Sequence, residues 1–299
     1  MTSAIVTAML IAARLADGWQ RTVDPAWLAG WHPEPFDLGD GTAEVVTMGE
    51  GPPLLLLPPL PGYKEAWIGV ARLFARRFRV VTFDLRSRFA GPPSWDALGG
   101  DLERVAAAFA PGAAIVMGHS LGGALAQRWT LAHPERVRAL VLSSSFPRVG
   151  SPRGTWRKRY LEQSLVLASQ RWLPEPLAAP LARRLAARGA WVYDRRCDDR
   201  VLAFVRHGIR SVPIPLARER VRLAFAHDTH AELRRITAPT LLLVGERETR
   251  WAREATDDMA RLIPGAQVRV SPGVAHLHPL TGAEWLAETV GEWAERTVG

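Results

Sequence analysis

Cysteine is nearly absent from this sequence, in which Cys197 is the single thiol among 299 residues. One cysteine cannot form an internal disulfide, and it cannot supply the cysteine clusters of the usual structural zinc sites. The eight histidines are scattered, and their densest group, residues 227–230, has no complementary ligands at metal-site spacing. Glycine-rich nucleotide motifs of the G-x-G-x-x-G or G-x-x-x-x-G-K type are also missing. We therefore expect no metal ion and no cofactor.

Long hydrophobic runs are missing too. The apolar run at residues 4–13 is too short for a transmembrane helix, which needs about 20 apolar residues. No basic residue precedes it and no small-residue cleavage site follows it, as a secretory signal would require. We interpret the run as the apolar face of an N-terminal helix, and expect a cytoplasmic protein with no integral membrane segment.

Lysine is scarce, because Lys64 and Lys158 are the only two and arginine supplies nearly all of the positive charge. The net charge of +8 is modest for this length and gives no reason to expect nucleic acid as a partner. The charge is uneven, however. Residues 146–222 hold 16 arginines and one lysine against six acidic residues, a net charge of +11, and the rest of the chain carries −3. This basic segment predicts either a helical layer with solvated arginines or a surface that attracts an anionic substrate or lipid.

The remaining composition, 47% hydrophobic and 23% charged residues, is typical of a folded globular protein. Short apolar strands alternate with helical patterns up to residue 143 and again from residue 240, which predicts a mostly parallel central sheet flanked by helices. The expected strands are 43–48, 54–57, 78–83, 114–117, 139–142, 240–244 and 267–270, with the first two joined as a hairpin. The expected helices are 67–76, 98–109, 121–132, 253–262 and 285–296.

An insertion interrupts this alternation. Between the two regular stretches lie roughly 80 residues with helical patterns near 160–170, 177–187, 200–206 and 216–226, far more than an ordinary connection needs. We predict three parts: an N-terminal extension, 1–42, packed on the core; an α/β core, 43–145 and 227–299; and an inserted helical cap, 146–226.

The strongest motif is the run Gly118-His119-Ser120-Leu121-Gly122-Gly123, which follows an apolar strand and opens a helix. This is the G-x-S-x-G pattern in the context it requires, where a sharp turn exposes the serine hydroxyl and the glycines let strand and helix approach. A hydroxyl needs an adjacent base, itself oriented by a carboxylate, to act as a nucleophile. Two later strands end in the acidic run 246–248 and in His276, so both candidates are predicted at the same sheet edge as Ser120.

With these motifs the chain resembles the α/β-hydrolase superfamily over residues 43–299, and within it the capped, esterase- or lipase-like serine hydrolases. The resemblance implies Ser120 as nucleophile, Glu248 as the acid and His276 as the base. Glu246 is the main rival for the acid, and His278 for the base. His119, beside the nucleophile, is expected to pack or to form hydrogen bonds rather than to transfer protons.

The resemblance also implies an oxyanion hole and a substrate pocket. The donors would be the backbone N–H groups of Leu121 and Leu60. Leu60 lies in a loop where many relatives have His-Gly but this chain has Pro58-Pro59. The candidate pocket residues, for which plain packing is the alternative, are Tyr63, His119, Trp156, Trp172, Trp191 and Phe204. Arg86 or Arg88 could reach a substrate anion, with solvated surface arginines as the alternative.

These expectations combine into a serine hydrolase that cleaves carboxylic esters of small molecules through a Ser120 acyl-enzyme. A serine at this position excludes the haloalkane dehalogenases and epoxide hydrolases of the fold, which use aspartate there. A lactonase, thioesterase, perhydrolase, acyltransferase or C–C bond hydrolase with the same triad stays open, as do a non-enzymatic ligand receptor and a lipid-surface protein using the basic cap. A homodimer is left open as well.

Overall fold

The computed structural model of this chain describes residues 27–86, 91, 93–149, 172–188 and 193–298. Its centre is an eight-stranded sheet with the order β1-β2-β4-β3-β5-β6-β7-β8. Strands β3 to β8 run parallel to one another, whereas β1 and β2 are antiparallel to their neighbours, so the expected mostly parallel sheet is confirmed. The strands are β1 (Glu34–Asp37), β2 (Thr42–Met48), β3 (Pro53–Leu57), β4 (Arg79–Phe83), β5 (Ala114–His119), β6 (Val137–Ser143), β7 (Thr240–Gly245) and β8 (Gln267–Ser271).

The hairpin predicted for the first two strands of the core is wrong. Strand β4 lies between β2 and β3, and Val81 of β4 pairs with Leu55 of β3 on one side and with Thr47 of β2 on the other. Residues 54–57 of β3 are buried on both faces, which is typical of a central strand with parallel neighbours, whereas β2 alternates between buried and exposed residues near the edge. The turn at residues 49–52 is therefore a crossover to the interior of the sheet.

The predicted N-terminal extension, residues 1–42, contributes to the sheet within its described part. Strand β1 pairs antiparallel with β2, with Phe36 opposite Ala43. The Phe36 ring also packs against Phe109 of α3 (Trp95–Phe109), at a centroid distance of 5.1 Å. The edge strand thus begins before residue 43, where the sequence pattern placed the start of the core.

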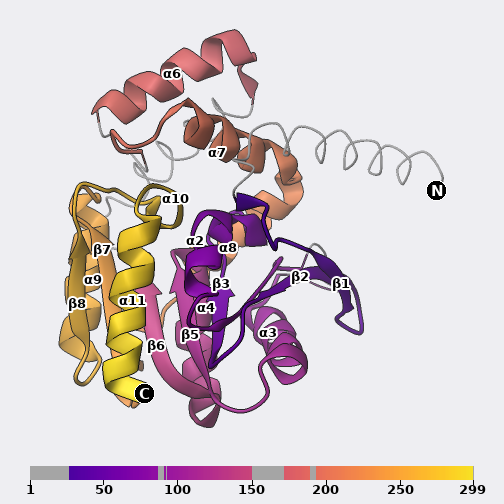
Figure 1. Ribbon diagram of the computed structural model, residues 1–299, viewed down its shortest axis with the longest axis vertical. Helices are drawn as coiled ribbons and strands as arrows, with labels where there is room; N and C mark the ends of the chain where they lie inside the picture. Colours follow the sequence, from indigo (N-terminus) through magenta and orange to yellow (C-terminus); the bar gives the residue numbers. More distant parts are fainter. Residues whose placement is uncertain (1–26, 87–90, 92, 150–171, 189–192, 299) are drawn as a thin grey trace.

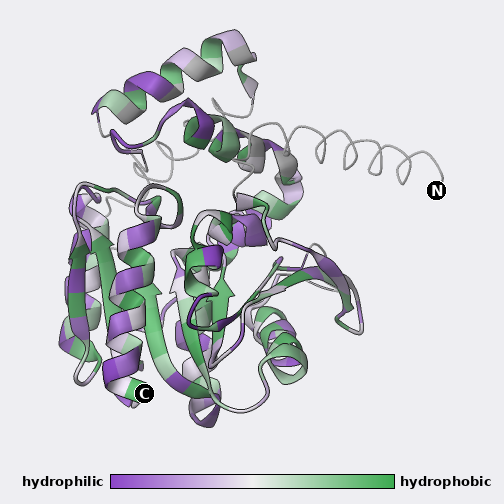
Figure 2. Ribbon diagram, viewed as in Figure 1, coloured by the Kyte–Doolittle hydropathy of each residue, from purple (hydrophilic) through white to green (hydrophobic). Residues whose placement is uncertain are grey.

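Helices cover both faces of the sheet, as Figure 1 shows. One buried cluster joins the sheet to α3, α4 (Leu121–Ala132) and α9 (Arg250–Leu262). The other joins it to α2 (Ile68–Phe74) and α11 (Ala283–Val298). Short helical turns complete the core: η2 (Lys64–Trp67), η3 (Pro134–Arg136), η4 (Leu233–Arg235) and α10 (His278–Thr281). In Figure 2 the strands between these layers are the most hydrophobic part of the molecule.

The inserted segment leaves the core after β6 and returns before β7. Its described part holds α6 (Glu175–Arg188), α7 (Asp199–Ser211) and α8 (Ile214–Ala226), and the expected helix at 160–170 lies outside the described residues. Figure 1 shows α6 and α7 beyond one end of the sheet. Buried cap residues continue the core on both sides, with Phe204 in one apolar cluster and Leu223 in the other. No helix among the residues described has the length and apolar character needed to cross a bilayer.

Candidate active site

Ser120 sits in a strained turn between β5 and α4. Its backbone has φ 52° and ψ −114°, outside the regions that a serine ordinarily adopts. The flanking glycines allow the turn, because a Cβ on Gly118 would lie 2.3 Å from the Gly122 carbonyl oxygen. Two hydrogen bonds secure it: Ser120 N–H donates to the Ser143 carbonyl at 2.9 Å, and Ser145 Oγ donates to the Ser120 carbonyl at 3.0 Å. The sequence motif thus forms the predicted strand-turn-helix.

The structure brings Glu248 and His276 together from the ends of β7 and β8. Glu248 Oε1 lies 2.6 Å from His276 Nδ1, a short charge-assisted distance. The Glu248 side chain is only 3% exposed, whereas the His276 side chain is 19% exposed. The acid is therefore shielded from water while the ring keeps access to the surface, which suits a histidine that exchanges protons with a substrate.

Glu246, the rival acid, faces another partner. It is exposed, and its Oε2 accepts a hydrogen bond from Gly273 N–H at 2.7 Å. Gly273 has a φ of +72°, so this position in the tight turn before His276 requires glycine. Glu246 therefore ties the two loops together, and the geometry favours Glu248 as the partner of the histidine.

His278, the rival base, is fully buried at the start of α10. Its Nε2 is 3.0 Å from Ser144 Oγ, and burial lowers its pKa to about 4. Ser144 itself has a φ of 43° and follows β6, so this contact links the ends of two strand connections. A neutral, enclosed ring with a serine partner fits a structural role.

His119 directly precedes Ser120 in the chain, and its ring packs beside that of His276. Its Nδ1 is 3.0 Å from the Ser143 carbonyl oxygen, and its ring centroid is 4.8 Å from that of His276. Burial holds the pKa of His119 well below its usual range, with a smaller contribution from the charge of His276. The ring is therefore neutral at ordinary pH, and it packs beside His276.

The loop after β3, which contains Leu60, contacts the start of α4, which begins at Leu121. A Cβ on Gly122 would be 2.1 Å from the Leu57 carbonyl oxygen and 2.8 Å from that of Pro58, so the loop and the helix are in backbone contact. Among the described residues, neither Leu60 N–H nor Leu121 N–H has a hydrogen-bond partner. Unpaired N–H groups at a helix N-terminus favour a developing negative charge.

A buried arginine of the cap, Arg220 of α8, braces this loop. Its guanidinium donates to the Pro61 carbonyl, and also to the Leu85 and Arg86 carbonyls at 2.7 and 3.1 Å. Burial lowers the pKa of Arg220 to about 10. Tyr63 gives a second contact with the cap, because a Cβ on Gly208 of α7 would lie 2.3 Å from the Tyr63 hydroxyl. Tyr63 therefore packs at the boundary between the cap and the core.

A cluster of ion pairs around a buried lysine follows the loop directly. Lys64 Nζ, 2% exposed, contacts Glu44 and Glu65 at 2.6 Å and Asp84 at 3.1 Å. Burial raises the pKa of Glu65 to about 7, and burial also raises the pKa of Asp84. Sequence reasoning missed this cluster because its members come from three separate segments, residue 44, residues 64–65 and residue 84. The one feature of the sequence that could have drawn attention to Lys64 is the scarcity of lysine.

The other predicted site residues are not gathered here. Arg86 is buried and paired with Asp101 at 2.5 Å and Asp40 at 2.9 Å, so its charge is used within the fold rather than at the surface. Trp172 is 69% exposed in the cap. Trp156, Trp191 and Arg88 lie outside the described residues. Phe204 is fully buried and packs edge-on against Trp27, at a centroid distance of 5.9 Å.

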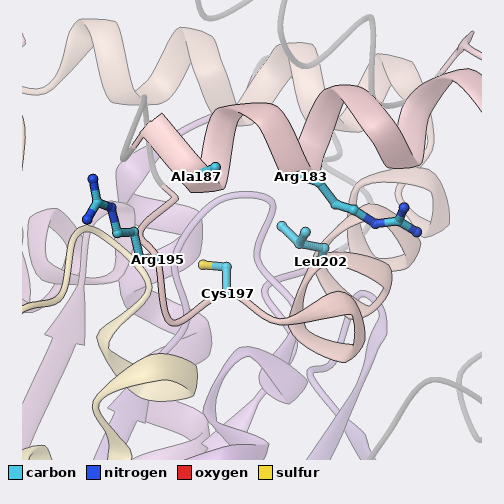
Figure 3. Close-up of a pocket in the computed structure, with 5 residues that line it drawn as sticks. All are labelled: Arg183, Ala187, Arg195, Cys197 and Leu202. Atoms are coloured by element: carbon cyan, nitrogen blue, oxygen red, sulfur yellow. The ribbon is translucent and has the colours of Figure 1, made fainter.

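A cavity of about 370 Å³ lies within the cap, lined by Arg183, Ala187, Arg195, Cys197 and Leu202 (Figure 3). The buried Cys197 thiol has a raised pKa because of burial. The residues that line the cavity come from α6, α7 and the segment between them, and they are separate from the residues around Ser120. Within the part of the chain that the structure describes, no group of three or more His, Cys, Asp or Glu side chains could hold a metal ion.

Comparison with known proteins identifies the family to which this chain belongs. A family model described as alpha/beta hydrolase fold matches residues 52–283. The pimeloyl-[acyl-carrier protein] methyl ester esterase of Nitrosomonas europaea is 30% identical over 236 residues, covering 78% of this chain and 91% of that protein. The enzyme of the same name from Nitrosospira multiformis is 29% identical over 251 residues, covering 80% and 93%.

Among solved structures, a thermophilic esterase from Thermogutta terrifontis, with malate bound, aligns with a TM-score of 0.71. It is 24% identical and covers 90% of this chain and all of that chain. The alignment therefore supports the fold.

Proposed function

Because this chain belongs to the α/β-hydrolase fold family and is a carboxylic ester hydrolase, we propose that it cleaves esters through an acyl-enzyme on Ser120. The observation that carries the proposal is the 2.6 Å contact between Glu248 and His276, at the same edge of the parallel sheet where Ser120 is held in a strained turn. Together these residues supply the nucleophile, the base and the acid that orients the base.

In the first half of the reaction, the Ser120 hydroxyl attacks the ester carbonyl carbon while His276 Nε2 takes its proton. Glu248 accepts the Nδ1–H of the ring and stabilises the imidazolium that forms. The N–H groups of Leu60 and Leu121 donate to the oxygen that becomes negative. When the tetrahedral intermediate collapses, the ester C–O bond breaks and His276 returns the proton to the departing alcohol.

In the second half, water replaces the alcohol. His276 takes a proton from the water as it attacks the acyl carbon, and then protonates Ser120 as the acid product leaves. The neutral rings of His119 and His278 favour this cycle, because neither places a second positive charge beside the imidazolium. No cofactor takes part in the proposed chemistry.

The basic cap favours an ester with an anionic acyl group or an anionic carrier. Residues 146–222 have a net charge of +11, and exposed arginines of the described cap include Arg184, Arg195 and Arg218. The relatives named above are esterases for a methyl ester whose acyl chain is borne by a carrier protein. A carrier-borne or otherwise anionic acyl ester is therefore the second, more specific candidate.

The first test is turnover of p-nitrophenyl esters of increasing acyl length by the wild type and by Ser120→Ala. We expect hydrolysis by the wild type only, with the preferred chain length reporting the room beneath the cap. For the second candidate, the comparison is between a neutral acyl ester and one with a terminal carboxylate. If the basic cap attracts the anion, kcat/KM for the ester with the carboxylate, divided by kcat/KM for the neutral ester, is expected to fall with added salt. A ratio independent of salt would remove that candidate and leave ester hydrolysis standing.

A further inference from the structure

A cap residue, Asp194, contacts the loop that carries His276. This aspartate is fully buried, and it comes from the segment between α6 and α7. Its Oδ2 accepts a hydrogen bond from Ala275 N–H at 2.8 Å and another from Thr281 Oγ1 at 3.1 Å. Ala275 directly precedes His276, so a single carboxylate oxygen from the cap bridges the two sides of the histidine.

Within its own segment the carboxylate is fixed in direction. Asp194 Oδ1 accepts from Arg196 N–H at 2.8 Å, and the Asp194 carbonyl accepts from Cys197 N–H at 3.1 Å. The turn has two sides, because Arg195 and Cys197 line the cavity of Figure 3 while Asp194 faces the core. Three hydrogen bonds compensate the burial of the carboxylate, which would otherwise be costly.

The histidine loop has two separate supports. Its first half is held from β7, since Glu246 Oε2 accepts from Gly273 N–H at 2.7 Å and Arg247 N–H donates to the Val274 carbonyl at 2.9 Å. Its second half, from Ala275 to Thr281, is held by Asp194. Ala275 is fully buried, so without the aspartate its N–H would be shut away from water and left without this partner.

We propose that Asp194 is a positioning residue for His276, through which the cap fixes the backbone that aims the imidazole at Ser120. The proposal rests on the proposed function in one respect, the role of His276 as the base. A small misplacement of a catalytic group can lower a rate by about 100-fold, so loss of this support should act on catalysis and not only on cap packing.

The test compares Asp194→Ala with Asp198→Ala, a matched control four residues along the same segment. Asp198 also accepts a hydrogen bond from a backbone N–H, that of Val201 at 2.8 Å, but it caps α7 and is exposed. Three quantities are measured: the rate of Ser120 labelling by a phosphonate, kcat and KM for a short p-nitrophenyl ester, and the low-field proton NMR signal of the His276 Nδ1–H in its bond with Glu248.

For Asp194→Ala we expect kcat and the labelling rate to fall by about 10- to 100-fold with little change in KM, and the low-field signal to weaken. Asp198→Ala should retain all three. Asp194→Asn keeps the volume and one acceptor oxygen, so it should restore part of the rate, and it carries the test alone if Asp194→Ala does not fold.

Equal behaviour of the Asp194 and Asp198 variants would overturn the proposal, as would a change in KM alone with an unaltered NMR signal. If wild-type Ser120 is not labelled, the proposed function fails. In that case the NMR signal still tests whether Asp194 positions His276.

Discussion

Replacement of Glu248 by glutamine removes the charge opposite His276 while keeping the shape of the side chain. The Glu248 side chain is 3% exposed and its Oε1 lies 2.6 Å from Nδ1, so bulk water screens the pair poorly. With charge centres about 4 Å apart and an effective dielectric constant of about 20, the lost attraction to the imidazolium is about 4 kcal/mol. Since 1.36 kcal/mol corresponds to a tenfold change in rate, we expect kcat to fall roughly a thousandfold.

The matched control is Glu246→Gln, which removes an equal charge two residues away. Glu246 is exposed, and the glutamine amide oxygen can still accept the Gly273 N–H, so we expect a change in kcat within about threefold. The assay is the release of p-nitrophenol, whose steady-state rate gives kcat and whose pre-steady-state phase gives the rate of Ser120 acylation. An equal or larger loss in Glu246→Gln would refute the assignment of Glu248 as the triad acid.

Three further variants test the packing around the site. Gly122→Ala would place a Cβ 2.1 Å from the Leu57 carbonyl oxygen, so we expect urea unfolding to show a free energy of unfolding lower by about 1–3 kcal/mol or more. The control is Gly99→Ala, whose Cβ would have nothing within 4 Å and should raise the free energy of unfolding by about 0.5–1 kcal/mol. Equal effects of the two substitutions would contradict the close approach of loop and helix. Burial lowers the pKa of His278 to about 4 in the folded protein, against 6.5 in the unfolded chain, so between these values the unfolded state binds the extra proton. The free energy of unfolding should therefore fall as the pH drops from 7 to 4. A His278→Asn variant whose free energy of unfolding has the same pH dependence would argue against this. Arg220→Met leaves three backbone carbonyls of core loops without their donor, so it should lower the free energy of unfolding by about 2 kcal/mol and slow the acylation of Ser120. An unchanged acylation rate would show that Arg220 does not position the loop that contains Leu60.

Most of the core could be predicted from the sequence because its signals are local. The helix expected at residues 121–132 has those same bounds in α4, and each predicted core strand is present within a few residues. The order of the strands depends on long-range pairing. A tight turn at residues 49–52 suggested a hairpin, but the burial of β3 on both faces places it in the sheet interior, with β4 between it and β2.

In the site too, some residues could be predicted from local sequence patterns, and others depend on long-range packing. Ser120, Glu248 and His276 each follow a strand in the parallel part of the sheet, and carboxyl ends of parallel strands share an edge, so a linear pattern could predict that all three lie at that edge. Asp194 and Arg220 belong to no sequence motif, and a solvated helical layer was one of the two interpretations of the arginines in this segment. Only the packing of the cap against two core loops buries them and gives them backbone partners.

The central claim is that Ser120 is a nucleophile activated by His276, and covalent labelling tests it most directly. A p-nitrophenyl phosphonate is incubated with the wild type, Ser120→Ala and His276→Ala, and the labelled peptide is identified by mass spectrometry. The account predicts one equivalent of label on Ser120 of the wild type, none on Ser120→Ala, and labelling of His276→Ala slowed by at least about 100-fold. Label on another residue, or equally fast labelling of His276→Ala, would contradict it.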